Sequence, residues 1–116
     1  MDRESTEAEK LNAICGKIVD CYQRIYGSAI RGIYLYGSYA RGDYDAESDI
    51  DFAAIVDGER RELQDKMYKL WDASAEIDLD YDVVISATVI PHAEFSKYKK
   101  HLRYYQNIEK EGRRIA

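Results

Sequence analysis

Hydrophobic residues recur along this chain with two different periods, and the change of period predicts the order of its helices and strands. In residues 5–26, apolar side chains return every three or four positions, which is typical of a helix with one buried stripe. Residues 32–36 and 50–56 are short runs rich in apolar, β-branched and aromatic side chains, which are typical of strands. The first half of the chain is therefore predicted to run helix, strand, strand, with a short helical turn at 38–41 between the two strands.

The second half of the chain adds two helices and one strand. Residues 59–74 are predicted to form an amphipathic helix and residues 79–86 a third strand. A last helix is predicted to begin at Pro91, which suits a first turn, and to end at Gly112. The expected inner residues are Leu63, Met67, Leu70 and Trp71 in the first of these helices and Phe95, Tyr98, Leu102, Tyr105 and Ile108 in the last.

This order of elements favours an α/β (α+β) fold in which a small mixed β-sheet carries helices on one face. The 116 residues fit a single domain spanning 1–116, because no linker-like segment or internal repeat divides them. Cys15 and Cys21 lie on different faces of the first predicted helix, so they are expected to be buried and reduced rather than bonded to each other.

The balance of charge and hydropathy argues against two classes of partner. The net charge is −5 and the pI about 5.0, whereas proteins that bind nucleic-acid backbones usually carry a surplus of Lys and Arg. Direct binding to nucleic acid is therefore not expected. The chain also shows no apolar stretch long enough to cross a bilayer and no cleavable signal, so we expect a cytoplasmic protein that does not bind membranes.

Gly37 and Ser38 end the first strand-like run and form the first part of a candidate site. A glycine lets the backbone turn sharply, and a helix that starts at Ser38 would direct free N–H groups and a hydroxyl toward a bound phosphate. Arg41 and Arg31 could add positive charge to such a nucleotide-binding site. The Gly-Ser pair is common, however, and taken alone it favours a plain turn.

Asp49 and Asp51 open the second strand-like run and form the other part of the site. Residues in a strand alternate sides, so the two carboxylates are expected on one face, with Ile50 on the other. Two like charges at this spacing repel each other unless a cation lies between them, which points to a metal site. The alternative is a pair of solvated acids at a strand edge. The apolar run at 52–56 weakens that alternative, because it indicates a central strand.

A site for two Mg²⁺ ions would need a third acid, because this metal takes several oxygen ligands. Asp82 is predicted to supply it, since it opens the apolar run 83–85 much as Asp51 opens its own run. Asp80 lies on the same face of the predicted strand and is the second choice. The alternative for either residue is an ordinary solvated acid at a strand end.

Together these residues predict the transfer of a nucleotidyl group from a metal-bound nucleoside triphosphate. Asp49 and Asp51 would bind both Mg²⁺ ions, and Asp82 would bind the ion that activates the acceptor hydroxyl. Ser38 and nearby backbone N–H groups would hold the leaving pyrophosphate. Catalysis would then rest on positioning and charge neutralisation, without a nucleophile supplied by the protein.

The same residues resemble a known signature. Gly37-Ser38, a ten-residue gap and Asp49-x-Asp51 resemble the signature of the DNA polymerase β-type nucleotidyltransferase superfamily. The string GSYARGDYDAESDIDFAAIV is similar to its minimal branch, often called MNT, and residues 107–112 are similar to the C-terminal helix of that branch. The resemblance implies the small nucleotidyltransferase core. It also implies the following site residues: Gly37 and Ser38 for the phosphates, and Asp49, Asp51 and Asp82 for catalysis and metal binding.

The resemblance also implies a partner. Minimal members of this branch resemble the antitoxin half of HEPN–MNT toxin–antitoxin pairs, in which the MNT protein binds a helical HEPN toxin, a ribonuclease. There it transfers AMP from ATP to a toxin tyrosine. The resemblance therefore implies a Mg²⁺-dependent protein adenylyltransferase with ATP as its substrate, which forms a hetero-oligomer with a HEPN-type toxin or a homodimer.

Two other functions stay open at this point. The chain could be a non-catalytic antitoxin that neutralises its partner by covering it, and Tyr39, Tyr44 and Tyr104 are the tyrosines expected at an interface or at the rim of the site. It could also adenylylate a small molecule such as an antibiotic, although no second domain is left over to line an acceptor pocket. His92 and His101 lack the spacing of a metal-binding pair and are expected on helix surfaces.

Overall fold

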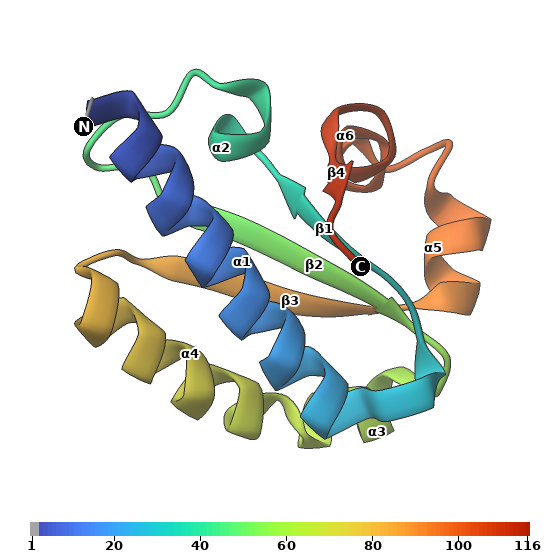
Figure 1. Cartoon of the computed structure of the whole chain (residues 1–116). Helices are drawn as coiled ribbons and strands as arrows, with labels where there is room; N and C mark the ends of the chain where they lie inside the picture. The colour runs from blue at the N-terminus through green and yellow to red at the C-terminus, as the bar shows by residue number, and fades with distance from the viewer. Residues whose placement is uncertain (1–2) are drawn as a thin grey trace.

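A four-stranded mixed sheet with the strand order β3-β2-β1-β4 forms the centre of the molecule (Figure 1). The structure, a computed structural model, describes residues 3–116. β1 (Ile30–Tyr36) pairs antiparallel with β2 (Ile50–Val56), and β2 pairs parallel with β3 (Ile85–Pro91). The two-residue β4 (Arg113–Arg114) pairs antiparallel with the other side of β1. The strand that carries Asp51 is therefore central, as the apolar run predicts.

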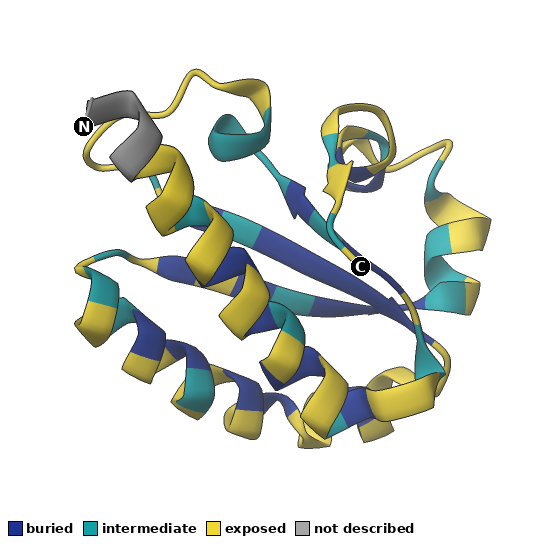
Figure 2. Cartoon of the chain, in the orientation of Figure 1, coloured by how far each residue is buried: buried dark blue, intermediate teal, exposed yellow. Residues whose placement is uncertain are grey.

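Two long helices cover one face of the sheet. α1 (Arg3–Tyr26) and α4 (Met67–Tyr81) lie next to each other across it, and α3 (Arg60–Asp65) leads into α4 (Figure 1). Figure 2 shows that buried residues gather on the strands and on the inner sides of these helices. The largest fully buried side chains of this layer are Tyr22, Phe52, Ile14, Ile18, Ile33, Leu35, Ile50, Leu70 and Val56.

The opposite face is covered by the C-terminal part of the chain. α5 (His92–Tyr98) and α6 (Arg103–Glu111) lie there, and Tyr105 and Ile108 of α6 meet alternate residues of β2 in a second, smaller apolar cluster. The predicted α/β (α+β) class with a small mixed sheet is confirmed. The structure adds that helices lie on both faces of the sheet rather than on one.

The first half of the chain folds as its hydrophobic pattern predicts. α1 is followed by a 3-10 turn, η1 (Gly27–Ala29), and β1 then runs to the turn at Gly37. The short α2 (Ser38–Arg41) follows directly, as predicted, and β2 has the predicted bounds. Cys15 and Cys21 are both buried and free.

Of the strand predicted at 79–86, only residues 85 and 86 belong to β3, because α4 runs on to Tyr81. The inner side of α4 keeps helical spacing over its whole length, whereas Leu79 points outward with 85% of its surface exposed. Asp82 ends the helix in the left-handed conformation, with φ 54°, and β3 begins at Ile85. Neither Asp80 nor Asp82 opens a strand. The buried residues of α4 are Met67, Leu70, Ser74 and Ile77.

The helix predicted at 59–74 is divided in two at Lys66. The N–H of Lys66 bonds back to carbonyls of α3 before α4 begins. Trp71, predicted on the inner side, is 56% exposed. It lies beside the buried stripe of α4, on a side that also carries Tyr68 and Leu79 and faces solvent. The prediction for Trp71 is therefore wrong, because the buried stripe is narrower than the apolar one.

The last predicted helix is also divided. α5 ends at Tyr98, whose carbonyl accepts the N–H groups of His101 and Leu102 in a turn that precedes α6. This turn lets α6 rotate so that Tyr105 and Ile108 face the sheet, and it leaves Tyr98 and Leu102 exposed instead of buried. Within residues 3–116, no helix is both long and apolar enough to cross a membrane.

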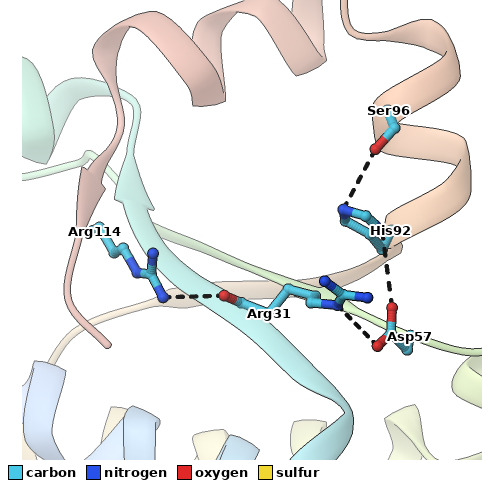
Figure 3. A network of polar contacts seen from close by, with 5 residues as sticks. All are labelled: Arg31, Asp57, His92, Ser96 and Arg114. Carbon is cyan, nitrogen blue, oxygen red and sulfur yellow. Dashed lines mark hydrogen bonds and ion pairs between the residues drawn. The ribbon is translucent and has the colours of Figure 1, made fainter.

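A network of polar contacts joins several elements at the end where β2 stops (Figure 3). Arg31 Nε donates to Asp57 Oδ2 at 2.9 Å, and His92 Nδ1 lies 3.8 Å from Asp57 Oδ1. Ser96 Oγ lies 3.4 Å from His92 Nε2, and Arg114 Nη2 donates to the Arg31 carbonyl at 3.1 Å. The network connects β1, the residue after β2, α5 and β4 at the far end from Asp51.

Candidate functional site

The end of β1 and the start of β2 bring the two sequence motifs together. Tyr36, the last residue of β1, is the cross-strand partner of Asp51, and Gly37 follows directly. Gly37 has φ 73°, a conformation that L side chains rarely adopt, and a Cβ at this position would collide with Asp51 Oδ2. Glycine is therefore required here both by the turn and by the close approach of the backbone to the Asp51 carboxylate.

Ser38 begins a single helical turn beside this contact. The Gly37 carbonyl accepts the N–H groups of Ala40 and Arg41, each at 3.1 Å, which closes the turn. The N–H groups of Ser38 and Tyr39 precede these two, at the end of a helix where donors have no carbonyl partner within the helix. They are the backbone donors that an anion in front of α2 would meet.

Asp49 and Asp51 lie on either side of Ile50, which is buried in the core. Asp49 is exposed and Asp51 is half-buried. Burial raises the pKa of the Asp51 carboxyl, the charge of Asp49 raises it further, and the charge of Arg41 lowers it. The two carboxylates therefore repel each other at short range, and a cation bound between them would relieve that repulsion.

Arg41 connects α2 to the end of α6. Its Nη1 donates to Glu111 Oε2 at 3.1 Å, and its Nε donates to Asp43 Oδ2 at 3.3 Å. Figure 1 shows α2 and α6 at the same end of the sheet, on either side of the tip of β1. The guanidinium is thus held by two acids while its charge still lowers the pKa of Asp51.

Tyr36 and Tyr104 form a wall of the site next to Asp51. Their hydroxyl oxygens are 2.8 Å apart, and their rings meet edge to face with centroids 5.7 Å apart. Burial raises the pKa of both phenols, and the charge of Asp51 adds to the rise in each. Tyr104 is one of the tyrosines that the sequence places at an interface or rim. Tyr36 is not singled out by its sequence, although its place as the last residue before Gly37 is a usable signal.

Asp82 does not join this group. It lines a cleft of about 600 Å³ together with Ile50, near the N-terminal part of α1 and the loop that follows α2. Tyr39 and Tyr44 also line the cleft, and their stacked rings have centroids 4.0 Å apart. Because Ile50 and Asp51 point to opposite sides of β2, the Asp51 side chain points away from this cleft, whereas Asp49 lies before the strand begins.

A different acid, Asp78, interacts electrostatically with Asp49. Its Oδ1 accepts the N–H of Ile85 at 2.9 Å, and burial raises its pKa, to which the charge of Asp49 adds. Within residues 3–116, no group of three or more His, Cys, Asp or Glu side chains could hold a metal together. Asp49 and Asp51 fit an ion such as Mg²⁺, which takes one or two carboxylates and fills its other positions with phosphate and water oxygens. Asp82 would have to move before its carboxylate could bind the same ion.

Comparison with known proteins places the whole chain among similar sequences and folds. Residues 15–115 match the family described as nucleotidyltransferase domain. Putative protein adenylyltransferase MJ0604 of Methanocaldococcus jannaschii is 36% identical over 113 residues, which cover 97% of each chain. Putative protein adenylyltransferase MJ0141 of the same organism is 35% identical over 82 residues, which cover 69% of this chain and 73% of the relative.

A solved structure shares the fold. The crystal structure of a toxin-antitoxin with AMP-PNP superposes with a TM-score of 0.56 and 17% sequence identity. The superposition covers 88% of this chain and 72% of the other chain. At this identity the likeness shows the fold alone, and it agrees with the mixed sheet and helices described above.

Proposed function

This chain is a member of the nucleotidyltransferase domain family, and we propose that it is a protein adenylyltransferase that transfers AMP from ATP to a tyrosine hydroxyl of a partner. The observation that carries the proposal is the approach of Gly37 to Asp51, because it sets a turn suited to phosphate beside carboxylates suited to Mg²⁺. The names of the two relatives support AMP as the transferred group and a protein as the acceptor. We place the reaction in the cytoplasm.

The turn after Gly37 would hold the β- and γ-phosphates of ATP. The N–H groups of Ser38 and Tyr39 and the Ser38 hydroxyl are the donors at the front of α2. As the bond to the α-phosphorus breaks, negative charge grows on the pyrophosphate, and donors already in place stabilise that charge without rearrangement. Arg41 would add a positive charge at the same end of the sheet, at the side of Asp51.

Asp49 and Asp51 would hold Mg²⁺ together with phosphate oxygens. When bound, the metal neutralises charge on the phosphates and helps to orient the attacking and leaving oxygens. The chain contributes by holding these carboxylates in position before the metal binds. Asp51 is the second residue of a strand that is paired on both sides, and its carboxylate lies close to Gly37, so the paired backbone fixes where this side chain begins.

We retain Asp82 as the proposed acid on the acceptor side of the site. It lines the cleft that also contains Tyr39 and Tyr44, so an acceptor tyrosine that entered this cleft would meet the Asp82 carboxylate. A shift of residues 82–84 would be needed to bring this carboxylate to the acid pair. Comparing Asp82→Asn with Asp80→Asn tests the choice, because only the first change should lower the rate of transfer.

The acceptor is proposed to be a HEPN-type toxin. The relative that is 36% identical is named as a protein adenylyltransferase, which supports a protein as the acceptor. The structural neighbour with AMP-PNP is a toxin–antitoxin, which supports a toxin as the protein that presents the tyrosine. The chain would then act as an antitoxin that inactivates its partner covalently.

A second candidate function is neutralisation by binding alone. Tyr68, Trp71 and Leu79 form an exposed apolar strip along α4, with 57%, 56% and 85% of their surfaces accessible. Exposed strips of this kind are typical of surfaces that bind other proteins. In this alternative the acid pair would contribute little to neutralisation.

One experiment separates these functions. The chain is incubated with Mg²⁺, with ATP labelled at the α-phosphorus, and with the proposed HEPN-type partner protein. We expect label on that protein, and we expect none when Asp49 and Asp51 are both changed to Asn. A folded chain that leaves its partner unlabelled would contradict the proposed transfer. If the Asn variant still neutralises the toxin fully, binding alone is sufficient.

A further inference from the structure

Tyr104 places a phenol hydroxyl near Asp51 of its own chain. Tyr36 stands directly opposite Asp51 in the antiparallel pair of β1 and β2, so the two side chains leave the sheet on the same face, with Cβ atoms about 5 Å apart. The hydroxyl oxygen of Tyr104 is 2.8 Å from that of Tyr36. A tyrosine hydroxyl of the same chemical class as the proposed acceptor is therefore already present at the site.

We propose that the chain adenylylates itself on Tyr104. This inference rests on the proposed function, because it uses the same ATP and the same acid pair. The phenol oxygen of Tyr104 would form a bond to the α-phosphorus of ATP. The bond from that phosphorus to the oxygen bridging to the β-phosphorus would break, and pyrophosphate would leave. The phenolic proton would pass to a neighbouring carboxylate and then to water, so no oxidant or further reactant is needed.

Tyr104, and not Tyr36, is able to carry the added group. Tyr36 lies in a strand with β2 on one side, and its half-buried ring packs edge to face against Tyr104 of α6. Tyr104 is 44% exposed. The inner face of α6 is anchored by Tyr105 and Ile108, which are buried, so the Tyr104 side chain can change rotamer without unpacking the helix.

The link between α2 and α6 keeps Tyr104 in reach. Arg41 at the end of α2 bonds to Glu111 at the end of α6, which ties the helix that carries Tyr104 to the turn proposed to hold the triphosphate. Donor nucleotide and acceptor hydroxyl would thus be held by one chain. Self-transfer should therefore be unimolecular, with a rate that does not depend on protein concentration.

The test measures the mass of the intact chain after incubation with ATP and Mg²⁺, followed by mapping of the modified peptide. We expect the mass to rise by one AMP, located on Tyr104, at a rate per molecule that stays constant when the protein is diluted tenfold. Tyr104→Phe should lower this modification at least tenfold, and Asp51→Asn should do the same. Tyr98→Phe is the matched control, because it makes the same chemical change at another exposed tyrosine. Tyr98 lies on α5 and is 40% exposed. The control variant should leave the modification unchanged.

Failure of this inference can be told apart from failure of the proposed function. Label on the HEPN-type partner without any AMP on Tyr104 would overturn self-modification and leave the adenylyltransferase activity standing. Full self-labelling of the Tyr104→Phe variant, or of the Asp51→Asn variant, would also overturn it. Label on neither protein, with thermal unfolding showing both to be folded, would remove the proposed function and this inference together.

Discussion

The two ends of β2 carry acidic residues in opposite electrostatic settings. Beyond its last residue, Asp57 is held by the Arg31 guanidinium at 2.9 Å, with His92 on its other oxygen. At its start, Asp51 is half-buried beside Asp49, and its pKa is raised by burial and by that like charge, with only partial relief from Arg41. Asp57 is satisfied within the fold, whereas Asp49 and Asp51 lack such compensation.

The acid after the end of β2 connects elements of the fold, whereas the acids at its start are proposed to bind a ligand. Surface ion pairs such as Arg31–Asp57 connect elements and contribute little free energy each. Carboxylates held close together against their own repulsion lower stability, and they persist where a ligand uses them. The far end of the sheet therefore serves the fold, and the near end serves the proposed chemistry. Five predictions follow from this division, in order of decreasing expected effect.

The largest expected effect is on catalysis by the acid pair. Asp51→Asn should lower AMP transfer about 10³-fold, because it removes a fixed charge at the reacting centre. Asp57→Asn makes the same change at the other end of β2 and should leave transfer within about twofold, because this carboxylate is tied up in a surface ion pair. Rates with labelled ATP measure both. Equal losses in the two variants would mean that the two ends do not differ in the proposed way.

The next effect concerns the contact between the two motifs. Gly37→Ala should lower transfer about 10²-fold, because the added Cβ displaces the Asp51 carboxylate. Gly42→Ala is the control for a positive φ, since Gly42 lies in the milder left-handed region with φ 88° and its Cβ would meet nothing within 4 Å. Denaturant titration should show that Gly42→Ala lowers the free energy of unfolding by about 1 kcal/mol and that Gly37→Ala lowers it by more. A similar loss of activity in both would show that strain, not the Asp51 contact, decides it.

The dependence of stability on pH should have opposite signs at two acids. The folded pKa of Asp51 lies above its ordinary value of 3.8, so its ionised form destabilises the fold at neutral pH. Asp51→Asn should therefore stabilise the fold at pH 7 by at most about 1 kcal/mol, and this gain should vanish as the pH falls to about 4. Thermal unfolding between pH 3 and 7 measures it.

Glu94 should behave in the opposite way. Its hydrogen bond with Arg60 holds the pKa of its carboxyl below the ordinary value of 4.5. Its contribution to stability is present above that value and is lost as the pH falls through the lowered pKa. Glu94→Gln should therefore destabilise the fold slightly at pH 7 and not in acid. A stabilising effect of Glu94→Gln at neutral pH would contradict the assignment.

The smallest effect is expected at the far end itself. A double-mutant cycle on Arg31 and Asp57 should give a coupling free energy of about 0.5 kcal/mol, as for other exposed pairs. The coupling should shrink in high salt, because both side chains are solvent-accessible. A coupling of several kcal/mol that resists salt would show that the network in Figure 3 is a main source of stability.

The first half of the fold could be predicted from the sequence because each of its patterns allows one interpretation. The stripe of α1 is long and strictly helical, and β1 and β2 are short apolar runs bounded by turns. The closeness of Gly37 and Asp51 could be predicted, because the end of one strand lies beside the start of its antiparallel neighbour. The local chemistry and the chain topology agree there.

The second half could not be predicted in the same way. Residues 79–83 alternate apolar and polar side chains, which favours a strand, while the inner residues of α4 continue with helical spacing up to Tyr81. Packing against α1 favours the helix, and the sequence of residues 79–83 does not reveal that contact. The same limit applies to Tyr104. Its approach to Tyr36 depends on the turn that divides α5 from α6.

The short β4 has a consequence for how this protein must be handled. Its pairing with β1, together with the bonds of Ile115 and Ala116 to Ile33, occupies backbone groups that would otherwise lie open along the outer side of β1. Trimming residues 113–116 would uncover that strand and leave it free to recruit an extended peptide or another copy, the usual start of fibre-like aggregation.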